Sequence, residues 1–295
     1  MTLQKAFDKF IFAKRIQGLS NKSIEDYEMM IGLFVRHVGG DVDVECLTRA
    51  QVDDYMMYQL NRSLSRSTYA SYIRNAKIFL MWLETECSID VQATEIKTPK
   101  SPKTMPYIYS KDDIIKIFSI IRFDEEWLTY RNKSMVALML DSGLRQEEIC
   151  NLKQADIDFH GNIIKVHGKG NKERLVPLGT LAKSFLLSYL ELCPHKSKRL
   201  FVNLHGENMT TTALKQIARK MAKLLPFEFT CHKLRHNFAT NYCLDQYEQY
   251  GKIDVYSLMA IMGHESLQTT ERYMHIARQI LASRQHVSHL DRILA

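Results

Sequence analysis

The stretch Thr230–Tyr242, which reads TCHKLRHNFATNY, places three groups that can carry positive charge on about one and a half turns of a helix. They are His232, Arg235 and His236. Positive groups this close repel one another unless an anion lies in front of them. Their crowding therefore predicts that this segment binds an anion.

Three other segments carry groups suited to the same anion. SGLRQEEI places Arg145 after a glycine at a helix start, and GKGNKER places Lys169 in a glycine-flanked hairpin turn. MGHESLQTTERYMH contains His264 and Tyr273. Each has an ordinary alternative: an ion pair of Arg145 with Glu148, a solvated lysine, or a packed tyrosine. Together they supply several donors and a nucleophile.

One chemistry uses all of these groups. The fork of an arginine matches two phosphate oxygens, and histidine adds a donor or a base near neutral pH. A tyrosine hydroxyl, with a free pKa of about 10, becomes a nucleophile when cations stabilise its anion. A phosphodiester attacked by tyrosine gains negative charge on its non-bridging oxygens, which fixed cations can stabilise in place of a metal. We therefore expect no metal and no cofactor.

The first third of the chain is predicted to be a small bundle of four helices, residues 1–90. Apolar residues recur at helical spacing, and the connections are short. Ser20 and Ser67 are suitable N-caps, and Thr48 with Gln51 has the spacing of a capping box. Residues 91–107 follow with three prolines and Lys97, Lys100 and Lys103, which is typical of a basic linker or of an ordinary surface loop.

Residues 108–295 are predicted to form a larger, mainly α domain. A helix begins at Ser110, and an apolar helix and a short one flank Gly143. ADIDFHGNIIKVHGKGNKERLVPLG then changes to period two, which predicts three short antiparallel strands. The fold class is thus mainly α, a four-helix bundle plus an α-rich domain with a small three-stranded antiparallel sheet.

Composition permits a nucleic-acid partner. The 295 residues contain 40 Lys and Arg against 33 Asp and Glu, a formal charge of +7. Six scattered cysteines without a C-x-x-C pair indicate free thiols in the cytoplasm. We find no apolar run of membrane-spanning length and no signal peptide, so no membrane partner is expected.

The order of GLRxxE, GKGNKER, HxLRH, GH and a later tyrosine resembles the tyrosine recombinases, or phage integrase family. The motifs span roughly Ser110–Ala277, and the helical first domain is similar in architecture to the family's core-binding domain. Compact Xer-type and mobile-element members are the most similar. The resemblance implies site-specific cleavage and rejoining of duplex DNA through a 3′-phosphotyrosyl bond, without an energy cofactor, by a tetramer with four active sites.

The same resemblance implies a role for each residue of the site. Tyr273 would attack the scissile phosphate, and Arg145 and Arg235 would hold its non-bridging oxygens. Lys169 would protonate the leaving 5′ oxygen.

The remaining groups would assist them. His232 would exchange a proton with the tyrosine hydroxyl, and His264 would donate to the phosphate. Glu148 would orient Arg145, and His236 would point into the core or support the site.

One segment departs from the family pattern. The run from HxLRH to GH is longer than usual here, and Asp245–Asp254 accounts for the extra residues. We expect a surface loop there. The C-terminal segment carries apolar residues at roughly helical spacing, which predicts a helix that docks on a neighbouring protomer or, alternatively, on its own domain; these are Ile280, Leu281, Val287, Leu290, Ile293 and Leu294.

A basic stretch in the first domain supports a DNA partner. NRSLSRSTYASYIRNAK interleaves Arg62, Arg66, Arg74 and Lys77 with hydroxyl residues that contact phosphates well, although a solvated helix face has the same pattern. With the linker lysines these groups would complete a clamp around DNA, whose binding should weaken steeply with salt.

Three other functions share some of these features. A type IB topoisomerase uses the same chemistry to relax supercoils, and a non-catalytic DNA-binding protein would keep the basic groups alone. A zinc site is suggested by His232 and His236, four residues apart. However, Lys233 stands where H-E-x-x-H requires glutamate, and Arg235 would repel a dication.

Overall fold

The computed structural model describes residues 1–100, 105–168, 172–285 and 293. The chain divides into two compact units, Met1–Thr104 and Met105–Ala295, and each is described by itself. In the described ranges, every helix is too short or too polar to cross a bilayer.

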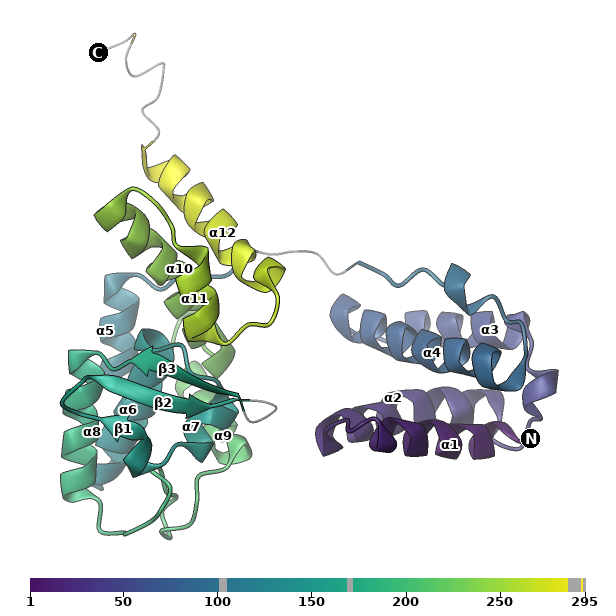
Figure 1. Cartoon of the computed structure of the whole chain (residues 1–295), viewed down its shortest axis with the longest axis horizontal. Helices are drawn as coiled ribbons and strands as arrows, with labels where there is room; N and C mark the ends of the chain where they lie inside the picture. The colour runs from purple at the N-terminus through teal and green to yellow at the C-terminus, as the bar shows by residue number, and fades with distance from the viewer. Residues whose placement is uncertain (101–104, 169–171, 286–292, 294–295) are drawn as a thin grey trace. The chain divides into compact units, whose positions relative to one another are not determined.

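The first unit contains four α-helices (Figure 1): α1 (Leu3–Ile16), α2 (Asn21–Val38), α3 (Arg49–Asn61) and α4 (Arg66–Cys87). The predicted N-caps are present at Ser20 and at the capping box of Thr48 and Gln51. Helix α4 begins earlier than predicted, because Ser65 rather than Ser67 accepts the hydrogen bond from the Thr68 amide.

Aromatic rings fill the interior of this unit. The ring of Phe79 lies 5.3 Å from Phe10, 5.8 Å from Phe7 and 6.3 Å from Phe34, all in edge-to-face geometry. Phe34 also meets Tyr55 edge-to-face at 5.1 Å. Such pairs add to the stabilisation that comes from burial of the rings and of the aliphatic side chains around them.

The start of the predicted linker belongs to the first unit. Val91, Ala93 and Ile96 are buried in its core, and Ala93–Glu95 forms a short 3-10 helix. Lys77 donates to the carbonyls of Thr94 and Ile96, both at 2.8 Å. Lys77 therefore fixes the segment that follows α4 to this helix. The sequence had instead predicted that this lysine contacts a DNA phosphate.

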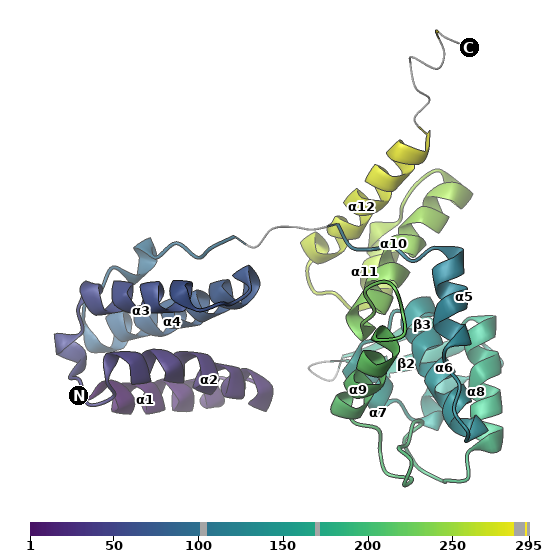
Figure 2. The same cartoon turned by 180° about the vertical axis from the view of Figure 1, so that it is seen from behind.

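The second unit is mainly helical, with a small three-stranded sheet on one side of its helices (Figures 1 and 2). Its helices are α5 (Lys111–Ser119), α6 (Glu126–Asp141), α7 (Gln146–Asn151), α8 (Thr180–Leu192), α9 (Thr211–Ala222), α10 (Cys231–Tyr250), α11 (Val255–Met262) and α12 (Leu267–Gln285). Its strands are β1 (Ile157–Asp158), β2 (Ile163–His167) and β3 (Glu173–Pro177), antiparallel in the order β1-β2-β3. The predicted fold class is confirmed.

Two packed regions position the functional side chains. Helix α6 packs against α8 and α10, and β2 turns Ile164 and Val166 toward this core. A second cluster joins α10, α11 and α12 and includes Phe238, Met262 and Tyr273. Tyr273 on α12 is thus packed in the same apolar cluster as the middle of α10.

The prediction of a loop at Asp245–Asp254 is wrong for most of its length. Helix α10 continues to Tyr250 and ends at Gly251, whose φ of 68° lies in the left-handed region that favours glycine. Asp254 then caps α11 by accepting from the amides of Tyr256 and Ser257. The extra residues therefore lengthen α10, and only a short connection lies between Tyr250 and the start of α11 at Val255.

Candidate active site

The turn before α7 must approach α10 very closely. Gly143 has φ 64°, and a Cβ atom there would lie 2.4 Å from the ring of Phe238. Only glycine permits this contact, which brings the Gly143 carbonyl to Nη1 of Arg235. Arg145 follows directly, so the glycine turn places the first motif arginine beside the second.

Glu148 is the common partner of three arginines. Its buried carboxylate accepts from Nη1 and Nη2 of Arg174 at 2.7 and 2.8 Å, and from the amide and Nη1 of Arg145 at 2.7 and 3.0 Å. Nη1 of Arg235 lies 3.9 Å away. Burial alone would raise the pKa of Glu148, but the hydrogen bonds and charge of Arg174 hold it below its ordinary value.

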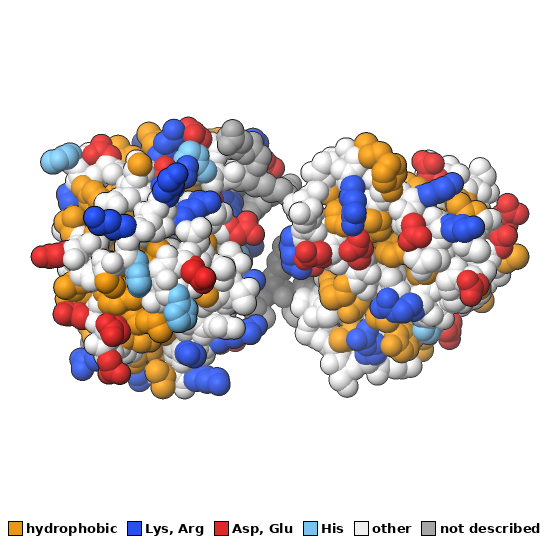
Figure 3. Space-filling view, turned by 90° about the horizontal axis from the view of Figure 1, so that it is seen from below, with side chains coloured by type: hydrophobic (Ala, Val, Ile, Leu, Met, Phe, Trp, Pro, Cys, Tyr) orange, Lys and Arg blue, Asp and Glu red, His pale blue; other side chains and the backbone are white. Residues whose placement is uncertain are grey.

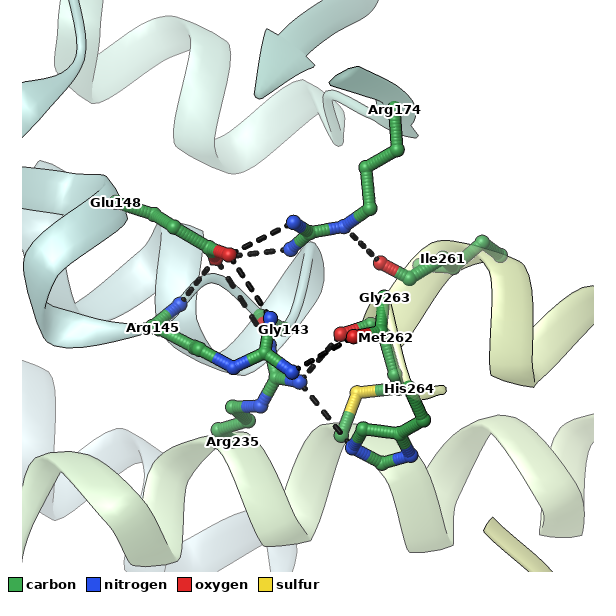
Figure 4. Close-up of polar contacts among 9 residues, drawn as sticks. All are labelled: Gly143, Arg145, Glu148, Arg174, Arg235, Ile261, Met262, Gly263 and His264. Carbon is green, nitrogen blue, oxygen red and sulfur yellow. Dashed lines mark hydrogen bonds and ion pairs between the residues drawn. The ribbon is translucent and has the colours of Figure 1, made fainter. Parts of the chain in front are cut away.

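The same three arginines bind the end of α11 (Figure 4). Nε of Arg174 donates to the Ile261 carbonyl at 2.7 Å and Nη2 of Arg235 to the Met262 carbonyl at 2.5 Å. Nη2 of Arg145 donates to the next carbonyl, that of Gly263, at 2.9 Å. These carbonyls lie at a helix C-terminus, where the last turn has no intrahelical donors.

His264 follows this turn, and its tautomer is set by its two neighbours. Nη2 of Arg235 lies 3.3 Å from Nε2, and Oγ1 of buried Thr270 lies 2.9 Å from Nδ1. Arginine can only donate, so Nε2 accepts and Nδ1–H donates to Thr270. Burial, followed by the charges of Arg235 and Arg145, lowers the pKa of His264 to about 4.

Tyr273 lies on α12 and is only 2% exposed. Its hydroxyl is 2.5 Å from Nδ1 of His236, and the ring of His264 is nearly parallel to its own ring at 6.2 Å. The guanidinium of Arg272 lies over the phenol ring, 5.0 Å from its centre. Burial raises the pKa of Tyr273, while the charges of Arg272 and Arg235 oppose this shift.

His236, rather than His232, is the histidine on the tyrosine hydroxyl. His232 is more exposed, and the two imidazole rings meet edge-to-face at 4.0 Å. Burial, then His232 and Arg272, lowers the pKa of His236 to about 3. Nη2 of Arg272 lies 3.2 Å from its Nε2, so protein groups face both nitrogens of His236. This arrangement does not fit the zinc pair considered above.

Lys169 lies outside the described residues. Its described neighbours, Gly168 and Lys172, line a groove of about 1150 Å³ together with Arg145, Arg174 and His264. Lys172 also forms an ion pair with Glu265 at 2.8 Å. The described residues on either side of Lys169 thus border the same groove as Arg145 and His264.

Of the residues predicted from the sequence, the structure brings together Arg145, His232, Arg235, His264 and Tyr273, with Glu148 and His236 as their supports. The ordinary ion pair of Arg145 with Glu148 is also present, and the Arg145 side chain remains 40% exposed. Anion binding and the ion pair are therefore compatible.

Three contributing residues were not predicted. Thr270 holds His264, Arg272 lies on Tyr273 and His236, and Arg174 binds Glu148. Arg174 had a usable signal, because in a period-two strand it shares a face with the apolar Val176. We find no sequence signal for Arg272.

The centre of the site carries excess positive charge. Three arginines surround the single carboxylate of Glu148. On the face in Figure 3, by contrast, basic and acidic side chains are interspersed over each unit. The arginine cluster therefore has the charge expected for binding one anion.

Comparison with known proteins gives the family. The model described as the phage integrase family matches residues 110–279. The chain is 30% identical over 286 residues to tyrosine recombinase XerD of Listeria monocytogenes serotype 4b (strain F2365), covering 92% of this chain and 93% of that protein. It is 24% identical over 290 residues to tyrosine recombinase XerC of Staphylococcus carnosus (strain TM300), covering 95% of each.

A solved structure shares the fold. The Tn1549 transposon integrase in complex with circular intermediate DNA matches with a TM-score of 0.73 and 18% identity, covering 95% of this chain and 99% of that one. This chain belongs to the phage integrase family. The sequence-based prediction of a tyrosine recombinase is confirmed.

Proposed function

We propose that the chain is a site-specific recombinase that cleaves and rejoins duplex DNA through a 3′-phosphotyrosyl intermediate, with no cofactor. One observation carries the proposal: Arg145, Arg235 and His264 meet beside Tyr273 in a single unit, with more arginine than carboxylate charge. A DNA phosphate supplies the missing negative charge.

In the cleavage step, the Tyr273 oxygen attacks the scissile phosphorus and the bond to the 5′ oxygen breaks. Arg145 and Arg235 stabilise the charge on the non-bridging oxygens. His264 donates to the phosphate in its other tautomer, in which Nε2 carries the ring proton and Nδ1 accepts from the Thr270 hydroxyl. Once the Tyr273 hydroxyl has left His236, His232 takes the tyrosine proton; burial, then Arg272, lowers the pKa of His232, so its ring is neutral and able to accept. Lys169 protonates the 5′ oxygen. Rejoining reverses each transfer.

Cleavage also requires a change around Tyr273. At 2% exposure, its hydroxyl is shielded by the residues that surround it, so phosphorus cannot reach it in this arrangement. DNA binding is therefore accompanied by a shift that exposes the start of α12. His236 holds the hydroxyl until that shift occurs.

Assembly on DNA is part of the proposal. Two DNA sites need four tyrosines, so the active form is a tetramer. The C-terminal segment would dock on a neighbouring protomer. In the structure Leu281 packs within its own unit, whereas Val287, Leu290 and Leu294 lie outside the described residues. Free thiols at all six cysteines support a cytoplasmic location.

Trapping of the covalent intermediate tests the function. A duplex selected for binding from a random-sequence pool is nicked near the cleavage position, so that the released fragment cannot religate. Wild type should form a covalent protein–DNA adduct, and Tyr273→Phe should form none. An adduct that persists in the variant refutes the nucleophile, and efficient relaxation of a plasmid lacking this site by a monomer favours a topoisomerase.

The role of Lys169 has its own test. Lys169→Ala should slow cleavage by about 10²-fold or more on an ordinary substrate, because the 5′ oxygen leaves poorly without an acid. A substrate with sulfur in place of that oxygen needs no acid and should be cleaved at nearly the wild-type rate. Equal losses on both substrates rule out the acid role.

A further inference from the structure

Arg174 differs from Arg145 in where its donors point. Nε, Nη1 and Nη2 all bind protein oxygens, and its side chain is 11% exposed. Arg145 is 40% exposed and belongs to the groove lining. Both side chains line the groove, but Arg174 gives all its donor nitrogens to protein oxygens (Figure 4), whereas Arg145 is the more exposed of the two.

Arg174 and Arg145 compete for the same carboxylate. Arg174 takes both oxygens of Glu148 in a fork at 2.7 and 2.8 Å, whereas the side chain of Arg145 makes one contact at 3.0 Å. Planar two-point pairing is the strongest form of this interaction. Without Arg174, the Glu148 carboxylate would be left to Arg145 and the more distant Arg235, and it would offset the charge of the arginine that faces the groove.

Arg174 also supports the turn that presents His264. A Cβ atom on Gly263 would lie 3.1 Å from Cδ and 3.2 Å from Cζ of Arg174, so the arginine packs directly on this glycine. Its Nε donates to the Ile261 carbonyl in the same turn. One side chain thus joins β3, α7 and the end of α11.

We propose that Arg174 is a positioning residue of the recombination reaction, which keeps Glu148 from neutralising Arg145 and fixes the turn before His264. This inference rests on the proposed function. With all three arginines and Glu148 charged, the cluster has two net positive charges. Loss of Arg174 leaves one, and loss of both Arg174 and the Glu148 charge restores two.

The test is a double-mutant cycle on adduct formation with the nicked substrate. Arg174→Met should lower the cleavage rate by about 10²-fold, with a much smaller effect on DNA affinity. Arg174→Met combined with Glu148→Gln should recover at least about tenfold of this loss, because Arg145 is released. A purely structural role predicts that the double variant is as slow as the single one or slower, and that result overturns the proposal.

A control and a second measurement separate the possible failures. Arg131 is another buried arginine, bonded to Asn132 and to the Val202 carbonyl away from the site, so Arg131→Met should lower thermal stability without the cleavage defect. The wild type and the cycle variants are also titrated with inorganic phosphate. Suppose that phosphate affinity falls in Arg174→Met and recovers in the double variant, but the wild type forms no adduct. The proposed function is then wrong and the role of Arg174 stands. If neither rate nor affinity is restored in the double variant, the role of Arg174 is wrong.

Discussion

The interiors of the two units are built differently. Within the described residues, Gln59 is the one fully buried polar side chain of the first unit, whose core is otherwise aromatic and aliphatic. The second unit buries polar and charged side chains in several places, including Arg131, Glu148, Arg235 and His236.

This difference separates stability from chemistry. Apolar burial stabilises a fold without directing any group toward a ligand. Buried charges cost free energy unless they are paired, and one carboxylate shared by three arginines leaves charge uncompensated. The anion site therefore lowers the stability of the second unit. Substitutions inside the first unit, by contrast, should affect folding alone.

The largest expected effect is on folding of the first unit. Phe79 is fully buried among four aromatic rings, so Phe79→Ala should lower the free energy of unfolding by about 3–5 kcal/mol. Urea unfolding followed by circular dichroism measures this loss. At a temperature where the variant is folded, adduct formation at saturating DNA should match wild type. A slower chemical step there would show that the two interiors are not separate in function.

The converse is expected in the second unit. Arg235→Met should reduce the rate of adduct formation by about 10²–10³-fold, because one donor to the developing charge is lost. DNA affinity, measured by gel shift, should change far less, since many phosphate contacts contribute to it. Arg235→Lys keeps the charge but loses the two-pronged guanidinium, so its rate of adduct formation should lie between those of wild type and Arg235→Met. A parallel loss of affinity and rate would place Arg235 in general DNA binding.

A smaller effect should appear as pH dependence. Burial lowers the pKa of His264 to about 4 and that of His236 to about 3, from an ordinary value of 6.5. Between the folded and unfolded pKa values of each histidine, the unfolded chain binds a proton that the folded chain does not. The free energy of unfolding is therefore highest above pH 6.5 in this respect and falls on acidification. Unfolding free energies at pH 7, 6 and 5 should decrease in wild type and decrease less in His264→Asn. Identical slopes would contradict the shifted histidine.

Much of the architecture could be predicted because it depends on local signals. Helical spacing and caps such as Thr48 with Gln51 gave the first bundle, and period-two alternation gave the three strands. The error at Asp245–Asp254 came from comparing lengths with the family pattern. Local signals were better, since no glycine or proline interrupts the helix before Gly251.

The sequence indicated which residue types form the site, but not which side chains contact one another. Histidine, arginine and tyrosine identities indicated the chemistry, but His236 rather than His232 reaches the Tyr273 hydroxyl. Both lie on α10, and their relation to α12 depends on tertiary packing that spacing does not encode. The role of Arg174 likewise depends on contacts among β3, α7 and α11.

The most direct measurement is the chemical identity of the covalent bond. The adduct formed on the nicked substrate is digested with protease and nuclease, and the nucleotide-bearing peptide is sequenced by mass spectrometry. We expect a single peptide with the nucleotide attached to Tyr273 through its 3′ phosphate. Attachment to another residue, or through a 5′ phosphate, would contradict the assignment of Tyr273 beside the arginine cluster.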